Sequence, residues 1–167
     1  MSLLAVCSTE IDWSATGAWF SGLATWAGVY FASRAMTTWK KQIRLQNRYQ
    51  KTDTLLRSFI LCLRAGHDWQ WDCGVGENRA TTSESEKLQL WRTALMEHRL
   101  AWELARSLFV EDECSTLTAN PDQLQSAIIA AGGHLRDAPT GTSLFEKDME
   151  ELMTVGVREI ITYRNAG

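Results

Sequence analysis

The chain has few of the residues that break helices or staple small domains. Only two prolines, Pro121 and Pro139, occur in 167 residues, and runs of alternating β-branched residues are scarce. The four cysteines show neither paired spacing nor the density of a disulfide-stapled secreted domain, so we expect reduced thiols. These absences favour an all-α fold, and the length allows one soluble domain beside one membrane span.

Motifs of catalysis are also missing. The sequence contains no Walker motif, no nucleophile elbow and no pair of histidines on one helix face, so we expect no enzyme, no cofactor and no metal. His67, Asp68, Asp72 and Cys73 come closest to a metal site, but their spacing matches no metal-binding pattern. His98 falls among apolar residues, which predicts a hydrogen-bonded core histidine rather than a catalytic or pH-sensing one.

Charge is absent from residues 13–33, which form a run of 21 residues rich in tryptophan, glycine and alanine. At 1.5 Å per residue a helix of this length spans about 30 Å, the thickness of a bilayer's hydrocarbon core. No Lys or Arg precedes the run, which argues against a signal peptide. The run therefore predicts a transmembrane helix over residues 13–36. Its glycines and serines make it less apolar than a run of leucines and leave open a buried helix in a soluble oligomer.

Basic residues gather directly after this run. Residues 34–64 hold eight Lys or Arg and a single acid, Asp53, whereas the rest of the chain is acidic. Basic residues flank the cytoplasmic ends of membrane spans, so we expect a bacterial inner-membrane protein with its N-terminus outside. The expected parts are a short extracytoplasmic N-terminus (1–12), the transmembrane helix (13–36), a basic juxtamembrane helix (37–66) and a cytoplasmic helical domain (67–167).

The expected span has one face of small residues and an opposite face of large ones. Advancing about 100° per residue, the small and hydroxyl-bearing side chains fall on one arc: Ser14, Gly17, Ser21, Ala24, Thr25, Gly28 and Ala32. Small residues let helices in lipid approach closely, so we expect a homo-oligomer of parallel helices, for which a tetramer is one candidate. The hydroxyls of this face either line a narrow pore or lie in a helix contact without conduction, and both readings remain open.

The basic juxtamembrane helix offers a second candidate site. Its cationic residues are Lys40, Lys41, Arg44, Arg48 and Lys51. Contact with anionic lipid headgroups is the favoured interpretation. The alternative is an oligonucleotide, whose phosphates the same groups would neutralise while Trp39, Tyr49, Trp69 and Trp71 stack on its bases.

The remaining sequence predicts a helical bundle. Leu56, Phe59, Ile60 and Leu63 form a stripe expected to dock on it, and residues 66–83, with three glycines, are expected to form a long loop. Three helices follow, each with an apolar face. The first, after a Ser83–Glu86 capping box, carries Leu88, Trp91, Leu95, His98, Trp102, Ala105 and Phe109; the second, after Asn120 and Pro121, carries Leu124, Ala127, Ile128 and Ala131 and stops at Gly132 and Gly133; the third, from Ser143, carries Phe145, Met149, Leu152, Gly156, Ile160 and Tyr163.

The N-terminus without Lys or Arg, the Trp- and Gly-rich run, the WKKQIRLQNR string and the small helical domain together resemble the membrane effectors of bacterial anti-phage defence. Among these the chain is most similar to the single-span effector of the Hailong system. The resemblance implies an oligomeric channel, gated through its cytoplasmic domain by a nucleotide or oligonucleotide from a nucleotidyltransferase partner. It covers the layout of the whole chain and carries over no functional residue. A membrane-tethered adaptor that recruits a cytoplasmic partner is the alternative.

Overall fold

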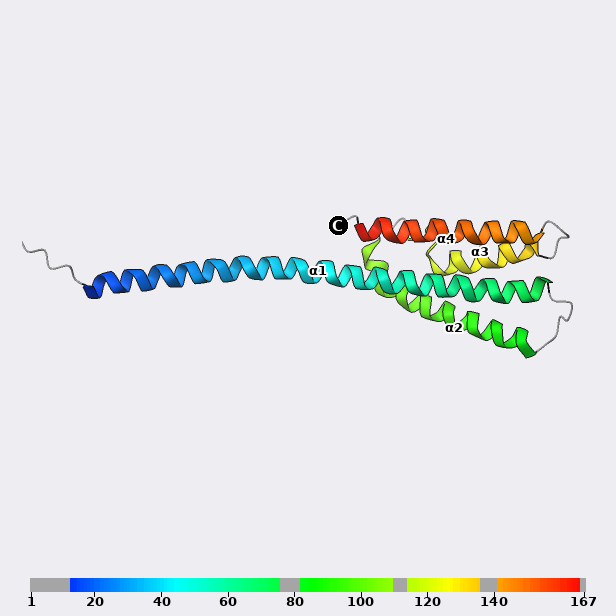
Figure 1. The fold of residues 1–167 in the computed structure, drawn as a ribbon, viewed down its shortest axis with the longest axis horizontal. Coiled ribbons are helices and arrows are strands. Elements are labelled where there is room, and N and C mark those ends of the chain that lie inside the picture. Colours follow the sequence, from blue (N-terminus) through cyan, green and yellow to red (C-terminus); the bar gives the residue numbers. More distant parts are fainter. Residues whose placement is uncertain (1–12, 76–81, 110–113, 136–140, 166–167) are drawn as a thin grey trace, which may run out of the picture. The chain divides into compact units, whose positions relative to one another are not determined.

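The computed structural model describes residues 13–75, 82–109, 114–135 and 141–165, and all regular structure in these ranges is helical. The α-helices are α1 (Trp13–Val75), α2 (Thr82–Ala105), α3 (Pro121–His134) and α4 (Gly141–Asn165). A short 3₁₀-helix, Arg106–Leu108, follows α2 (Figure 1). The predicted all-α fold is confirmed.

The chain divides into two compact units, Met1–Arg44 and Leu45–Gly167, which we call the N-terminal segment and the helical body. α1 passes through the boundary, so its first part is the helix of the N-terminal segment and its second part is the first helix of the body. The body thus begins at Leu45, inside the range expected as a juxtamembrane helix.

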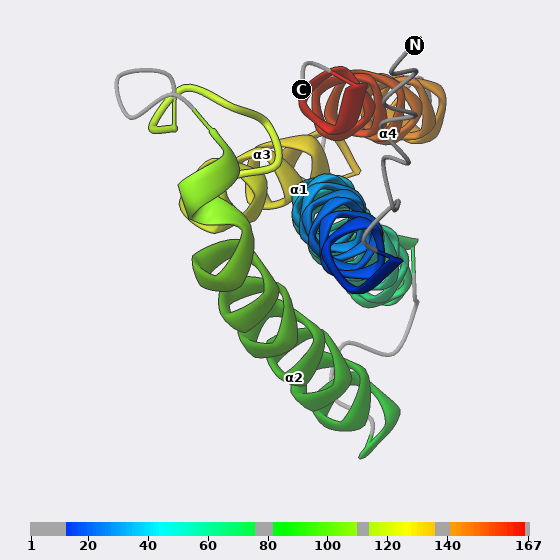
Figure 2. The same ribbon diagram turned by 90° about the vertical axis from the view of Figure 1, so that its left-hand side faces the viewer.

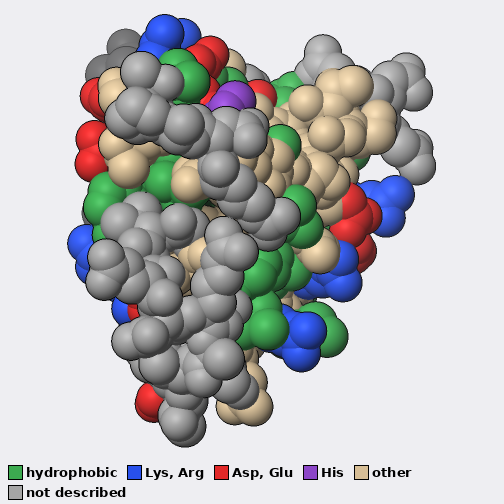
Figure 3. Space-filling view, turned by 90° about the vertical axis from the view of Figure 1, so that its right-hand side faces the viewer, with side chains coloured by type: hydrophobic (Ala, Val, Ile, Leu, Met, Phe, Trp, Pro, Cys, Tyr) green, Lys and Arg blue, Asp and Glu red, His purple; other side chains and the backbone are tan. Residues whose placement is uncertain are grey.

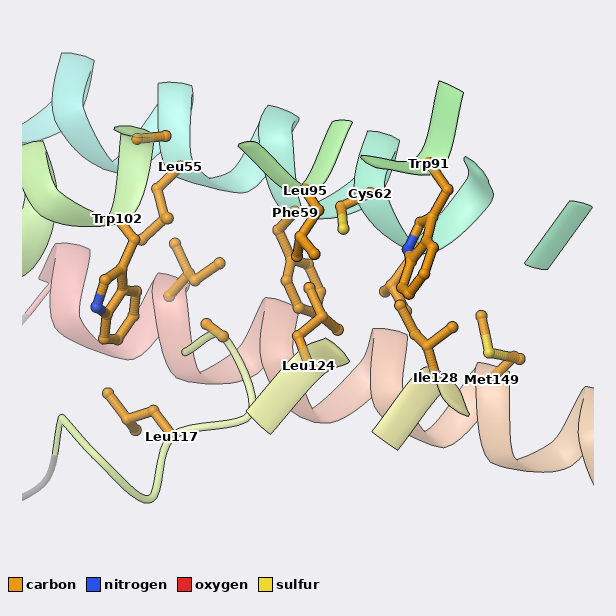
Figure 4. Close-up of a cluster of buried hydrophobic side chains, with 14 of the residues drawn as sticks. Leu55, Phe59, Cys62, Trp91, Leu95, Trp102, Leu117, Leu124, Ile128 and Met149 are labelled. Atoms are coloured by element: carbon orange, nitrogen blue, oxygen red, sulfur yellow. The ribbon is translucent and has the colours of Figure 1, made fainter. Parts of the chain in front are cut away.

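The core of the body draws side chains from α1, α2, α3 and α4. α3 lies between α2 and α4 (Figure 2). The largest side chains that are fully buried are Leu55, Phe59 and Cys62 of α1, His98 of α2, Leu124 and Ile128 of α3, and Phe145 and Ile160 of α4. Several of them converge in one cluster with Trp91, Leu95 and Met149 (Figure 4). The burial of these apolar groups, each worth about 1.5–3 kcal/mol, is the main force holding the helices together.

The periodic faces predicted for α2, α3 and α4 are confirmed. On α2 the side chains from Trp91 to Ala105 at steps of three and four are buried, and on α4 Phe145, Met149 and Ile160 are buried. Asn120 caps α3 as predicted: its side chain accepts a hydrogen bond from the Asp122 backbone N–H at 2.9 Å. The spacing of apolar residues was therefore a sound guide to these three helices.

The stripe predicted on α1 is confirmed at three of its four residues, since Leu56 packs against the core beside Phe59 and Leu63, and it is wrong at the fourth. Phe59 and Leu63 are buried, but Ile60 is exposed, and Leu55 and Cys62 lie in the core instead. The buried side of the helix also includes Thr52, Ser58 and Gln70, which are polar. A pattern built from apolar residues alone misses these positions and so misjudges the direction of the face.

The loop predicted over residues 66–83 is wrong for the most part. α1 continues to Val75 and α2 already begins at Thr82, while residues 76–81 lie outside the described residues. Gly66 does not break the helix, because its bare Cα allows α1 to approach α3: a Cβ there would lie 2.9 Å from Ile128 Cγ2. The indole of Trp69 stacks on that of Trp91, with ring centroids 4.4 Å apart, and joins this part of α1 to α2.

Three predicted helix ends also need correction. α3 does not stop at Gly132 and Gly133 but runs to His134, and the absence of a side chain at Gly132 makes room for the amide of Gln70. α4 begins at Gly141, two residues before the predicted Ser143. α2 begins one residue before Ser83, whose capping side chain lies outside the described side chains.

Gly156 fixes the closest approach between α1 and α4. A Cβ at this position would lie 2.2 Å from Cζ of Phe59, far inside van der Waals contact. Phe59 has no exposed surface and cannot swing into solvent. The pair therefore requires a residue without a side chain on α4 opposite a large ring on α1.

We predict that Gly156→Ala lowers the free energy of unfolding by about 1–3 kcal/mol, since the added methyl overpacks a core that cannot relax. The matched control is Gly133→Ala in α3, where a Cβ meets no atom within 4 Å. This control should be neutral or more stable by up to about 1 kcal/mol. Guanidinium unfolding of the full chain, followed by tryptophan fluorescence, measures both; equal stabilities would contradict the role of the Phe59 contact.

Candidate functional site

The helix of the N-terminal segment has an uncovered apolar surface. Every side chain from Gly17 to Gln42 is exposed. Large hydrophobic residues make up much of this surface: Trp19, Phe20, Leu23, Trp26, Val29, Tyr30, Phe31, Met36 and Trp39. The indoles of Trp19 and Trp26 are 76% and 77% exposed, values normally found for charged side chains. An apolar surface of this extent is typical of a binding surface.

The residues predicted to form the oligomer face lie together on this helix. Gly17, Ser21, Ala24, Thr25, Gly28 and Ala32 are exposed, and Ser14 lies in the same helix but outside the described side chains. A Cβ at Gly17 or Gly28 would meet no atom within 4 Å. The Thr25 hydroxyl donates to the backbone carbonyl of Ser21 at 2.8 Å. A hydroxyl satisfied within its own helix can enter apolar surroundings at low cost.

A hollow beside this face was not predicted from the sequence. It has a volume of about 340 Å³, and the small residues Ala18 and Gly22 line it together with Trp19, Leu23 and Trp26. Ala18 and Gly22 are four positions apart and so form a small-xxx-small step, which was the signal that could have revealed it. The N-terminal segment thus has two neighbouring strips of small residues.

Glycines, serines and threonines interrupt the apolar residues of the N-terminal helix. Within the described ranges, no helix contains an 18-residue stretch that is apolar enough to cross a bilayer.

The predicted basic residues divide between the two units. Lys40, Lys41 and Arg44 belong to the N-terminal segment and are exposed. Arg48 and Lys51 belong to the body and are half-buried. Only the first three therefore have the full exposure expected of a binding site for headgroups or phosphates.

Arg48 has a structural partner inside the body. Its guanidinium donates a short hydrogen bond to the backbone carbonyl of Tyr163, in the last turn of α4. Carbonyls at the end of a helix lack partners within the helix and carry partial negative charge, so a cation there is stabilising. The neighbouring Arg164 lies 6.0 Å from the ring centroid of Tyr49. These contacts fasten the end of α4 to α1.

Of the four aromatic residues considered as stacking platforms, two are exposed and two pack against the core. Trp39 is 60% exposed, and Tyr49 is 50% exposed. Trp69 and Trp71 instead pack against the core, Trp69 on Trp91 and Trp71 beside Phe145. Each of these two indoles thus already stacks on another ring of the body, Trp69 on Trp91 and Trp71 on His67.

The residues considered for a metal site are engaged with other groups. The His67 ring stacks on Trp71 and lies 3.3 Å from Asp68, and Asp72 forms an ion pair with Lys87. Among the residues that the structure describes, no three His, Cys, Asp or Glu side chains are placed to hold a metal ion.

At the end of the body where α1 finishes and α4 starts, acidic and basic side chains are interspersed over the visible surface (Figure 3).

His98 is a buried histidine with two hydrogen-bond partners, as predicted. Its Nε2 lies 2.9 Å from the Ala119 carbonyl oxygen, which can only accept, so Nε2 donates. Its Nδ1 lies 3.1 Å from Oγ of Ser58, whose hydroxyl is also within hydrogen-bond distance of the Leu55 carbonyl, at 2.9 Å. On the other side, Glu159 accepts from the Ala119 N–H at 3.2 Å. The segment between α2 and α3 is therefore held to α1, α2 and α4.

Burial shifts the pKa of two side chains in the core. It lowers the pKa of His98 to about 4, because a charged imidazolium would lose its hydration, although the bond to Ala119 opposes the shift. It raises the pKa of Cys62 to about 12, because a thiolate would lose its hydration in the core. At neutral pH the imidazole is uncharged and the thiol protonated, so these two groups serve packing rather than acid–base or nucleophilic chemistry.

Comparison of the chain with protein families, curated proteins and solved structures gives no match. Its function must therefore be inferred from the geometry of the chain itself.

We predict that Arg48→Met lowers the free energy of unfolding by about 1–2 kcal/mol, because it removes a charged hydrogen bond in a half-buried place. Arg44→Met is the matched control: Arg44 is exposed and should change stability by less than about 0.5 kcal/mol. Guanidinium unfolding of the full chain in mild detergent measures both. Equal effects of the two substitutions would argue against the Tyr163 contact.

We predict that acid weakens the body through His98. Its pKa rises from about 4 in the folded chain to about 6.5 on unfolding, so the unfolded state binds the proton more readily between these values. Stability is full above pH 6.5 and falls by about 3 kcal/mol as the pH drops to 4. The measurement compares unfolding of wild type and His98→Gln from pH 7.5 to 4; parallel curves would exclude His98 as the cause.

Proposed function

We propose that the chain is an effector of bacterial anti-phage defence whose N-terminal helix enters the inner membrane, assembles with copies of itself and permeabilises the bilayer. The helical body lies in the cytoplasm in this proposal, and a nucleotide or oligonucleotide signal acts on it. The observation that carries the proposal is the uncovered apolar surface between Gly17 and Gln42.

Lipid and neighbouring helices together account for both sides of this surface. In water, the apolar surface of Trp19, Trp26 and Phe31 would stay exposed, which costs about 25 cal/mol for each Å² of that surface. Hydrocarbon solvates such side chains as well as protein does, so the large residues need no partner helix. The glycines, alanines and hydroxyls of the opposite side gain most from close contact with another helix. Neither lipid alone nor neighbouring helices alone would suit both sides of this surface.

The basic residues support the proposed orientation. Lys40, Lys41 and Arg44 follow the uncharged run and are exposed. Each would gain about 1 kcal/mol beside the anionic headgroups of the cytoplasmic leaflet. The same three groups are also those available to neutralise phosphates of a nucleotide signal.

Permeabilisation, rather than simple tethering, is favoured by the small face. An adaptor anchored by one helix needs only an apolar surface, whereas here six described residues of small size or with a hydroxyl share one side: Gly17, Ser21, Ala24, Thr25, Gly28 and Ala32. In a ring of parallel helices this side would face the axis and its neighbours, where Ser21 and Thr25 would supply polar groups to a narrow path.

We predict that expression of the chain in bacteria depolarises the inner membrane and that Gly28→Leu reduces the rate of depolarisation by about tenfold, because a weakening of 1.4 kcal/mol in helix contact corresponds to that factor. A leucine at Gly28 would occupy the space that a neighbouring helix needs. A voltage-sensitive dye gives the measurement, with membrane content of each variant checked by fractionation.

Ala27→Leu is the matched control, since it introduces the same side chain one position away, toward the large residues that we assign to lipid. It should depolarise as wild type does. No depolarisation by the wild type, or equal effects of the two substitutions, would favour the tethered adaptor. Recovery of the wild-type chain as a monomer from the detergent-free soluble fraction would refute membrane insertion.

A further inference from the structure

The body has an exposed apolar face of its own on the outer side of α2. Leu90, Leu100 and Leu104 are 60%, 69% and 64% exposed, although the other side of the same helix is buried in the core. Leu90 also borders a hollow of about 380 Å³ between α1 and α2, which Leu61 of α1 lines from the opposite side. The face has no cover within the described part of the chain.

The spacing of this face fits a second helix. Leu90, Glu97 and Leu104 follow one another at intervals of seven, and Leu100 falls between the last two at the fourth position of the repeat. Such a repeat keeps one strip of a helix against a partner helix over several turns. The face is therefore suited to helix packing over its length.

Four charged side chains line the hollow: Arg64 and Asp68 of α1, and Lys87 and Glu97 of α2. Arg64 on α1 and Glu97 on α2 are both exposed and both border it. Within the described ranges neither has an ion-pair partner, whereas Lys87, on the same hollow, is paired with Asp72. A face that carries charges of both signs beside apolar residues is suited to pair with itself under a two-fold rotation, each unpaired charge meeting its opposite on the other copy.

We propose that this face binds the same face of a second copy of the chain, with Arg64 of each copy opposite Glu97 of the other and the leucines of the two α2 helices in contact. The inference rests on the proposed assembly of the N-terminal helices, which would bring the bodies of neighbouring copies together, and the face itself pairs two bodies even where the helix contact is weakened. The body interface then gives the assembly a second contact, on the cytoplasmic side.

Complementary charge reversal tests the pairing. Two tagged forms of the full chain are purified in mild detergent, both with Gly28→Leu to weaken the helix contact, and association is measured by analytical ultracentrifugation. The parent chain pairs. Arg64→Glu alone and Glu97→Arg alone place like charges opposite each other, so each pairs with itself about tenfold more weakly. A mixture of the two restores both ion pairs and the parent affinity.

The mixture separates this contact from all others, because any residual helix contact contributes equally to every sample. Leu90→Gln should weaken pairing as well, whereas Met153→Gln, at an exposed methionine of α4, should leave it unchanged. A parent that stays monomeric, single variants that pair as the parent does, or a mixture no better than the single variants would overturn the proposal. The depolarisation experiment with Gly28→Leu involves neither charge, so each proposal can fail without the other.

Discussion

Within the part of the chain that the structure describes, nothing covers the side chains from Gly17 to Gln42. This constraint governs the molecule, because the helix that carries them is the same helix that builds one wall of the body's core. From about Thr52 onward, α1 packs one side against the core of the body. Before that point the apolar groups are exposed, and in our proposal lipid covers the large residues and copies of the chain cover the small ones.

The body is organised by close contacts that leave little freedom to α1. Phe59 fits against Gly156, the amide of Gln70 fits against Gly132, and Gly66 lets α1 approach Ile128. Each contact depends on a missing side chain on one of two helices. Such contacts hold α1 in one register against α3 and α4, since sliding by one residue would bring a Cβ into each position.

The sequence predicted the helices whose faces are apolar and regular, and it failed where packing depends on other residue types. α2 and α4 were found from their three- and four-residue spacing. The end of α1 was misread as a loop because glycine normally interrupts helices. At Gly66 the helix continues, because the bare Cα lets α1 pack closely against Ile128 and Trp91, and this packing is a tertiary effect. Arg48 was placed with the basic residues, yet its partner Tyr163 lies 115 positions away, beyond any local pattern. The exposed surface of the N-terminal segment agrees with the predicted run, while its environment stays a prediction.

The stacked pair of Trp69 and Trp91 joins α1 to α2 at a centroid distance of 4.4 Å and an interplanar angle of 13°. Two indoles this close couple their electronic transitions, so the pair gives the molecule an optical signature that belongs to one helix interface. A change confined to that signature would report separation of α2 from α1 while α3 and α4 remain packed. The Trp69–Trp91 pair is thus an intrinsic optical probe for partial opening of the body.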